Sequence, residues 1–411
     1  MKNDYFSLDD LLLNITEKYP QTVDVFVSNG FSNMKDEEMR KQFGSHISLK
    51  NALAMKGKDI EAFSNLLFNC IDEEKQSIDA TLRSESNSSQ KDSLNIKGLL
   101  PCPVRIPLLE SFNTFVHEFS KNSSININYE LKAASMGVSW IEENIKGVED
   151  DKKLPDLFIS AGFDMFFDEN LFGKFKRKGV FKDLVGREQF NSTFKGLDLK
   201  DPEGHYSIIS VVPAVFLVNT NELGERQVPL SWEDILSDDF ENSVSLPVGD
   251  FDLFNGILLN IYKKYGESGV KQLGKNLLHA MHPSQMVKSE RAKIKRPAVT
   301  IMPYFFTKTV REGSSMKAIW PSDGAIISPI FMLAKTENSE KLSKIVEFFA
   351  SKDVGDILSK QGLFPSVHPE VDNNISSSNK FMWLGWDYIY NNNVTEQIDI
   401  CLKLFNQSSG E

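Results

Sequence analysis

The sequence predicts an α/β protein of more than one domain, preceded by a small all-α domain. The chain has 411 residues, more than one hydrophobic core usually organises. Its hydrophobic share of 41% and charged share of 25% are typical of packed globular domains. From about residue 95, strand patterns alternate with helical ones, whereas the first seventy residues show helical patterns alone.

The N-terminal residues carry the signals of short amphipathic helices. Ser7 stands three residues before Asp10, an N-cap pattern for a helix over 8–18, and Pro20 ends that helix. Further apolar stripes at helical spacing follow. We therefore expect a small helical domain over residues 1–70.

Residues 71–94 are predicted to be a linker. They are rich in Ser, Asp, Glu, Lys and Gln. So few apolar side chains cannot bury enough surface to offset the entropy lost on ordering the chain.

Three strand-to-helix turns follow the linker. The strand candidates are 95–100, 125–131 and 157–159, and the turns after them are 101–105, 134–137 and 160–164. In a mainly parallel sheet such turns gather at one edge, where ligands bind. The helices that follow present free backbone N–H groups and a positive dipole end.

Position at these turns, more than residue type, selects the ligand candidates of this region. An arginine can pair with a carboxylate or phosphate, a thiol can lie near a helix N-terminus, and Ser and Gly can offer hydroxyl and N–H donors. The other interpretation is a buried thiol, a surface arginine and ordinary helix caps. The candidates are Cys102, Arg105, Ser135, Met136, Ser160, Gly162 and Phe163.

The charge and cysteine content exclude several classes of function. The net charge of -11 disfavours nucleic acid or anionic membrane as a partner, and Lys174 to Lys178 is interpreted as a solvated helix face. No apolar run is long enough to span a bilayer. Cys70, Cys102 and Cys401 form no disulfide framework and suit a reducing compartment.

The N-terminus shows no secretory signal, because acidic residues interrupt the apolar stretch that a signal needs. We therefore expect a cytoplasmic protein, or an extracytoplasmic one if an export signal has been removed.

No catalytic residue, metal or cofactor is predicted. Residues 269–275 have P-loop spacing, but Asn276 replaces the required Ser or Thr and the stretch is helical in pattern. His279 and His282 could share a metal, but with no third ligand nearby they are interpreted as surface histidines.

Motifs in the second half of the chain carry a family resemblance. An apolar strand over 211–220 ends in Asn-Thr and precedes Pro-Leu-Ser-Trp-Glu-Asp at 229–234. Trp-Pro-Ser-Asp-Gly-Ala follows at 320–325, and Gln-Gly-Leu-Phe-Pro at 361–365. Over residues 95–410 the chain resembles type II periplasmic-type solute-binding proteins, the substrate-binding family of ABC transporters, and most of all their ferric-iron-receptor-like branch.

The resemblance implies the bilobal type II periplasmic-binding-protein fold, with two doubly wound α/β lobes. Lobe 1 would comprise residues 95–211 and 320–411, and lobe 2 residues 212–319. The lobes would close around a small solute (an anion, an organic acid or a metal complex) without chemistry, and an ABC permease would be a partner.

Further ligand candidates lie in or beside lobe 2. Asp250 and Asp252 follow the strand candidate 244–247 and could meet a cationic solute or cap a helix. Tyr304, Asp323 and Gly324 complete the candidate wall, although an aromatic residue there could equally belong to hinge packing. Iron receptors of this branch commonly use adjacent tyrosines. The sequence has no Tyr-Tyr pair, and Tyr388 and Tyr390 lie near the C-terminus, so ferric iron is not the first choice of solute.

The N-terminal domain resembles the DUF1858 type, a small helical domain found beside iron–sulfur and redox proteins, through its Asn29-Gly30-Phe31 pattern. That family often has a cysteine pair next, where this chain has Ser32 and Asn33, so we expect a docking role rather than a metal cluster. The alternatives to a transport receptor are a cytoplasmic ligand sensor and a thiol-dependent enzyme that uses Cys102.

Overall fold

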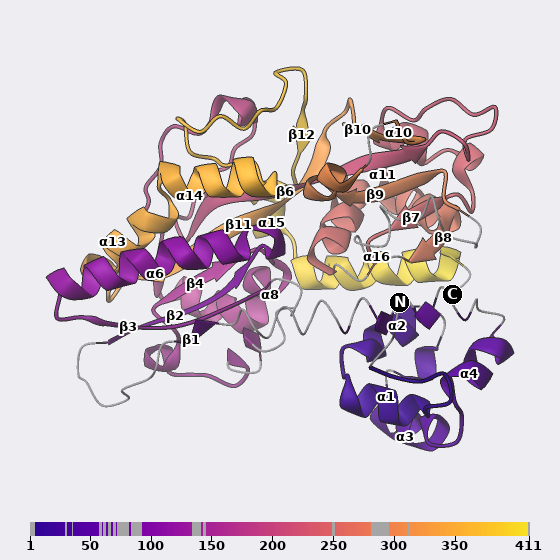
Figure 1. Cartoon of the computed structure of the whole chain (residues 1–411). Helices are drawn as coiled ribbons and strands as arrows, with labels where there is room; N and C mark the ends of the chain where they lie inside the picture. Colours follow the sequence, from indigo (N-terminus) through magenta and orange to yellow (C-terminus); the bar gives the residue numbers. More distant parts are fainter. Residues whose placement is uncertain are drawn as a thin grey trace.

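The computed structural model describes residues 5–28, 31–34, 36–56, 60, 63–64, 67–68, 71, 82–83, 93–133, 141–142, 145–248, 251–280, 296–310 and 313–409. The strands among them form one continuous twelve-stranded sheet, and helices cover the sheet (Figure 1). The N-terminal helices form a separate group beside it (Figure 1).

The N-terminal helices have a hydrophobic core of their own. Every side chain in that core belongs to the segment between Tyr5 and Ile71, and Leu12, Phe26 and Leu49 are fully buried in it. The helices are α1 (Leu12–Lys18), α2 (Thr22–Ser28), α3 (Glu37–Gly44) and α4 (Leu49–Met55). A helical N-terminal region is thus confirmed, while its boundary at residue 70 stays a prediction.

The first helix begins later than the Ser7–Asp10 pattern predicts. The Ser7 N–H donates to Asp10 Oδ2 at 2.9 Å and the Asp10 N–H donates to the Ser7 carbonyl at 3.1 Å, which closes a turn instead. Leu11 is extended and forms a β-bridge with Ser48. Because that bridge fixes Leu11 outside helical geometry, α1 starts at Leu12.

Lobe 1 is a sheet with helices on both faces. Phe158 packs on one face, whereas its neighbours Leu157 and Ile159 pack on the other, as alternation along a strand requires. The parallel strands, in spatial order, are β3 (Asn126–Ala133), β2 (Ser93–Leu100) and β4 (Leu157–Ser160). The Phe158 face packs against α8 (Asp164–Phe167), α9 (Lys174–Arg177) and α15 (Trp386–Asn391). The other face packs against α6 (Arg105–Asn122), α13 (Ser339–Phe349) and α14 (Lys352–Asp356).

Two long antiparallel strands join lobe 1 to lobe 2. They are β6 (Tyr206–Asn219) and β11 (Ala325–Lys335), paired from Tyr206 opposite Leu333 to Ala214 opposite Ile326. Beyond Ala214, β6 pairs instead with β9 (Val299–Pro303) and β10 (Met316–Ile319). The two lobes therefore share one sheet at their crossover, and the bilobal fold is confirmed.

In lobe 2 the same sheet continues from β9 into further parallel strands, which have helices of their own. Its further elements are β7 (Val244–Leu246), β8 (Leu277–Ala280), α10 (Trp232–Ile235) and α11 (Phe251–Asn276). The stretch with P-loop spacing lies inside α11, which confirms the helical interpretation. Gly274 in that stretch serves helix packing, since a Cβ there would lie 2.6 Å from the Phe405 carbonyl oxygen.

The C-terminal helix α16 (Val394–Ser409) contributes to the cores of both lobes. Val394 and Ile398 belong to the lobe 1 cluster with α8 and α15, whereas Cys401 and Phe405 belong to the lobe 2 cluster with α11. The predicted lobe boundaries assign all of this helix to lobe 1, and they remain a prediction.

Short elements complete the described fold. They are β1 (Leu82–Arg83), β5 (Phe181–Lys182), β12 (Phe381–Met382), η1 (Ser32–Met34), η2 (Cys102–Val104), η4 (Asp151–Lys153), η5 (Glu169–Gly173), η6 (Ser192–Phe194), η7 (Asp238–Phe240), η9 (Tyr304–Thr309) and η10 (Ile357–Gln361).

Candidate functional site

The turn that ends β4 in lobe 1 meets the first turn of α11 in lobe 2. The Phe163 N–H donates to Asp252 Oδ1 at 2.9 Å, although the two residues lie 89 positions apart in the sequence. Gly162 lies so close that an added Cβ would overlap the Asp252 carboxylate. Gly162, Phe163 and Asp252 are called the interlobe contact below.

Ser160 shapes the turn that carries the interlobe contact. Its side chain is completely buried, donates to the Gly162 carbonyl at 2.6 Å and accepts the Gly162 N–H at 3.0 Å. The hydroxyl therefore has local partners. The Phe163 N–H, rather than the Ser160 hydroxyl, is the donor that the turn presents to lobe 2.

The Phe163 ring also packs against α11. A Cβ added to Gly256, one helical turn beyond Asp252, would lie 3.6 Å from this ring, which is ordinary van der Waals contact. The interlobe contact therefore combines a charge-assisted hydrogen bond with apolar packing.

A second set of contacts joins η9 of lobe 2 to the end of η10 in lobe 1 and to the residues directly after it. The Lys308 ammonium donates to the carbonyls of Lys360 at 3.0 Å and Gln361 at 2.8 Å. The Phe305 ring lies 5.1 Å from the Phe364 ring. The sequence analysis missed this bridge, and the adjacent Phe305 and Phe306 directly after an apolar strand were the available signal.

Asp323 and Gly324 lie apart from the interlobe contact and hold α10 in place. Asp323 Oδ1 accepts the Trp232 N–H at 3.1 Å, and the Gly324 carbonyl accepts the Trp232 indole N–H at 2.9 Å. Asp323 Oδ2 also pairs with the Lys264 ammonium at 2.9 Å. Both residues have structural roles in lobe 2.

The remaining candidates are not brought to the interlobe contact by any contact that the structure describes. Arg105 is buried at the start of α6. The Tyr304 ring lies 5.2 Å from the Trp320 ring, on the opposite face of lobe 2 from α11. The Cys102 side chain and the residues Ser135, Met136 and Asp250 lie outside the described residues.

One further side chain, that of Cys401, bears on thiol chemistry. Cys401 is a buried free thiol, and burial raises its pKa to about 12, so it is protonated and unreactive near neutral pH. The described residues contain no group of three or more His, Cys, Asp or Glu side chains that could hold a metal ion. The His279 side chain and His282 lie outside that part of the chain.

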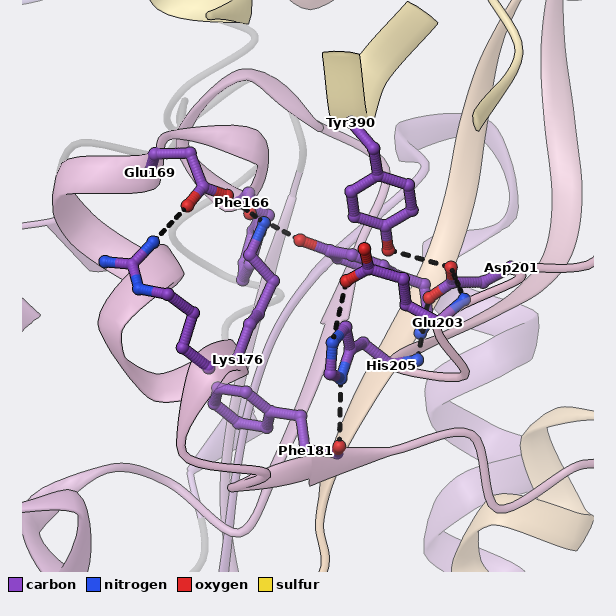
Figure 2. Close-up of polar contacts among 10 residues, drawn as sticks. Phe166, Glu169, Lys176, Phe181, Asp201, Glu203, His205 and Tyr390 are labelled. Carbon is purple, nitrogen blue, oxygen red and sulfur yellow. Dashed lines mark hydrogen bonds and ion pairs between the residues drawn. The ribbon is translucent and has the colours of Figure 1, made fainter. Parts of the chain in front are cut away.

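A buried polar network in lobe 1 (Figure 2) corrects in part the interpretation of Lys174 to Lys178 as a solvated face, because Phe175 and Lys176 are buried while Arg177 and Lys178 are exposed. Lys176 is only 6% exposed, because its ammonium pairs with Glu169 at 2.6 Å and lies over the Tyr206 and Tyr390 rings. Arg177 pairs with the same Glu169 carboxylate at 2.7 Å.

The network also anchors the C-terminal segment. The Tyr390 hydroxyl donates to Asp201 Oδ1 at 2.7 Å, which ties α15 to the segment that precedes β6 (Figure 2). Burial, followed by the negative charge of Asp201, raises the pKa of Tyr390. Tyr206 pairs opposite Leu333, which pairs with Phe158 near the start of β4, whereas the interlobe contact follows the end of that strand. The network shares no residue with the interlobe contact, although the Phe167 ring packs against both Tyr206 and Phe163.

We predict that Gly162→Ala weakens the contact between the lobes. The added Cβ must displace the Asp252 carboxylate, so the free energy of unfolding should fall by about 1–3 kcal/mol. Denaturant unfolding measures this change. Gly256→Ala is the matched control, because its Cβ meets the same Phe163 ring at an ordinary distance and should be neutral or stabilising. Equal stability of the two variants would contradict the described contact.

Comparisons with known proteins agree with this architecture. The model of the family described as "Bacterial extracellular solute-binding protein" matches residues 152–392, and that of "Domain of unknown function (DUF1858)" matches residues 6–64. No curated protein matches.

Solved structures show the same fold at low sequence identity. The substrate binding protein of an ABC transporter from Agrobacterium tumefaciens is 13% identical, with a TM-score of 0.54 over 80% of this chain and 99% of that one. The ferric binding protein from Campylobacter jejuni is 15% identical, with a TM-score of 0.51 over 77% and 99%. Iron-bound HitA from Pseudomonas aeruginosa is 11% identical, with a TM-score of 0.53 over 76% and 99%.

Two findings bear on location. The family is described as extracellular, so the match does not support the predicted cytoplasmic location. Among the described helices, none combines the length and the apolar character needed to cross a bilayer.

Because the family match covers more than half of the 411 residues, the chain belongs to the bacterial extracellular solute-binding proteins.

Proposed function

We propose that this chain binds a small solute at the interlobe contact, and that the solute presents an anionic oxygen to the Phe163 N–H. The observation that carries the proposal is the Asp252 carboxylate, which accepts this N–H from across the lobes. A backbone N–H that donates to a carboxylate of the protein can donate in the same way to a carboxylate or phosphate oxygen of a solute in the same position.

Gly162 supports this assignment. A turn without a Cβ leaves room for an anionic group beside the backbone N–H, and Asp252 fills that room here. Opening of the lobes would withdraw Asp252 and free the donor. The side chain would then act as an intramolecular competitor of the solute.

The aromatic residues after β9 favour an organic anion over a ferric ion. Tyr304, Phe305 and Phe306 carry a single phenol among them, whereas a hard ferric ion calls for several oxygen ligands. Tyr304 also faces away from α11, toward Trp320. We therefore place organic acids and phosphate esters before metal complexes as solutes.

We predict that Asp252→Asn raises the affinity for such a solute by about tenfold, because a charge-assisted hydrogen bond of roughly 1.5–3 kcal/mol is replaced by a neutral one of roughly 0.5–1.5 kcal/mol that competes less. Native mass spectrometry of the purified protein would first identify any retained solute. Titration calorimetry with that solute, or with a panel of small di- and tricarboxylates and sugar phosphates, then measures the affinity.

Glu267→Gln is the matched control for Asp252→Asn, since it removes an exposed carboxylate from the same helix, where Glu267 pairs only with Lys271 among the described residues. The affinity of the Glu267→Gln variant for the solute should equal that of the unaltered chain. A loss of affinity in Asp252→Asn would instead mean that the carboxylate contacts a cationic solute, and would refute the anionic assignment.

We also propose that binding proceeds without chemical turnover. The buried Cys401 thiol, with its pKa of about 12, is no nucleophile. If binding involves no chemistry, replacing the other candidate thiol should change nothing. Cys102→Ser should leave the solute chemically unchanged and its affinity within about twofold, as measured by calorimetry and by mass spectrometry of the recovered solute. Consumption of the solute by the unaltered chain, lost in this variant, would establish a thiol-dependent enzyme.

The helical domain is proposed to dock a protein partner, an ABC permease being one candidate. Its core is separate from the cores of the two lobes. It exposes Met39 and Phe43, which are 46% and 40% exposed and lie one turn apart on α3. Isolated exposed apolar residues are common, but a pair on one helix suits a contact surface.

We expect Met39→Ser/Phe43→Ser to abolish capture of a permease complex by the immobilised chain and to leave solute affinity unchanged. Deletion of residues 1–70 should have the same effect. Met55→Ser, at a 74% exposed residue of α4, is the control. Unaltered capture by the double variant would refute docking through α3.

A further inference from the structure

A pocket of about 730 Å³ lies beside β6, and its volume falls within the range of small-molecule sites, about 300–1,000 Å³. Four parts of the chain line it. Val215 belongs to β6, Tyr304 to η9, Ala318 to β10 and Asn379 to the segment before β12. The pocket is therefore built from strands of the crossover together with the C-terminal segment.

The pocket lies on the face of the sheet away from α11. Ala318 pairs opposite Leu217, which packs in one cluster with Val215. Lys317 pairs opposite Val218, which packs in the cluster that contains α11. Residues directly opposite each other in antiparallel strands share a face, and successive residues alternate between faces. The Ala318 side chain therefore points toward the pocket, whereas the Lys317 side chain points away from it.

The face that lines the pocket carries no charge among the described lining residues. Lys317 is the only charged residue in that lining, and its side chain lies on the other face. An ionised ligand would exchange its hydration for neutral groups without gaining a partner of opposite charge. The pocket therefore suits an uncharged ligand.

Two aromatic side chains form a corner of the pocket. The Tyr304 and Trp320 rings are 5.2 Å apart between centroids and inclined at 79°. The Trp320 indole N–H donates to the Lys380 carbonyl at 2.6 Å, and the Trp320 ring also lies against Phe381. A flat ring can lie against the face of one aromatic side chain in such a corner and meet the edge of the other. Because Trp320 is held in place, the corner is preorganised.

Two polar side chains of the lining are available to a ligand. The Tyr304 hydroxyl and the Asn379 side-chain amide have no hydrogen-bond partner among the described residues. The amide places an acceptor oxygen beside an NH₂ donor. Burial raises the pKa of Tyr304, so its hydroxyl stays protonated and can donate at neutral pH.

We propose that this pocket is a second binding site, for a small uncharged heteroaromatic ligand of the nucleobase type. The flat ring lies in the corner of Tyr304 and Trp320, since aromatic stacking requires no charge. The Asn379 amide pairs with a donor and an acceptor that are adjacent on the ring, as asparagine pairs with the edge of adenine. The site shares no residue with the interlobe contact and does not depend on the proposed solute.

The test uses adenine and two analogues as probes of the full-length chain. Purine lacks the amino donor of adenine, and purine-6-carboxylate has a charged carboxylate in its place. Titration calorimetry should show that adenine binds at a single site and that purine, without the donor, binds about tenfold more weakly. Purine-6-carboxylate should bind more weakly than adenine by about tenfold or more, because no cation faces it.

Two variants test the two parts of the site. Asn379→Ala should weaken adenine about tenfold and purine by only about threefold, because purine makes one of the two hydrogen bonds. Trp320→Leu should weaken adenine and purine by the same factor, about tenfold, because stacking does not involve the amino group. Asn379 is half-buried and its side chain bonds to no described residue, so Asn379→Ala should fold even if Trp320→Leu does not.

Lys317→Met is the matched control, because its side chain lies on the α11 face, and its affinity for adenine should equal that of the unaltered chain. Asp252→Asn should also leave adenine binding unchanged, so this proposal and the solute site between the lobes can fail separately. Circular dichroism and thermal unfolding confirm that each variant is folded. Absence of adenine binding, equal binding of adenine to Asn379→Ala and to the unaltered chain, or loss of binding in Lys317→Met would overturn the proposal.

Discussion

The antiparallel pairing of β6 with β11 is the constraint on which the rest of the structure depends. The two strands pair inside lobe 1 up to Ala214 and Ile326. Beyond that point β6 pairs with two strands of lobe 2, β9 along one edge and β10 along the other. Both strands are buried along almost their whole length, which explains their nearly continuous apolar sequences. Any motion of one lobe against the other must bend or twist these two strands.

The forces that hold the lobes together are of two kinds. Helix α16 buries Ile398 with lobe 1 and Cys401 and Phe405 with lobe 2, and truncation of a buried aromatic of this kind typically costs about 3–5 kcal/mol. The hydrogen bond from Phe163 to Asp252 is worth roughly 1.5–3 kcal/mol and has a ready substitute in water or solute. The polar contact is therefore the part that a solute can replace while the packing persists.

Local sequence patterns predicted the elements and the turns, because those depend on residues close together in the chain. The strand 157–159 and the turn after it lie where the pattern put them, and Ser160 and Gly162 hold that turn. The partner of Phe163 could not be predicted, since Asp252 reaches it only through the sheet order of the fold. The same limit applies to Lys176, whose burial depends on rings contributed by β6 and α15.

Candidate residues next to each other in the sequence need not serve the same site. Tyr304 faces Trp320, whereas Phe305 packs against Phe364 of lobe 1. Both residues belong to the 3₁₀ helix η9 that follows β9, and they pack in different hydrophobic clusters. On β6 itself, alternation sends Val215 and Phe216 to opposite faces. The crossover therefore presents two surfaces, one toward α11 and one toward Tyr304 and Trp320, and a change in the twist of β6 would move both.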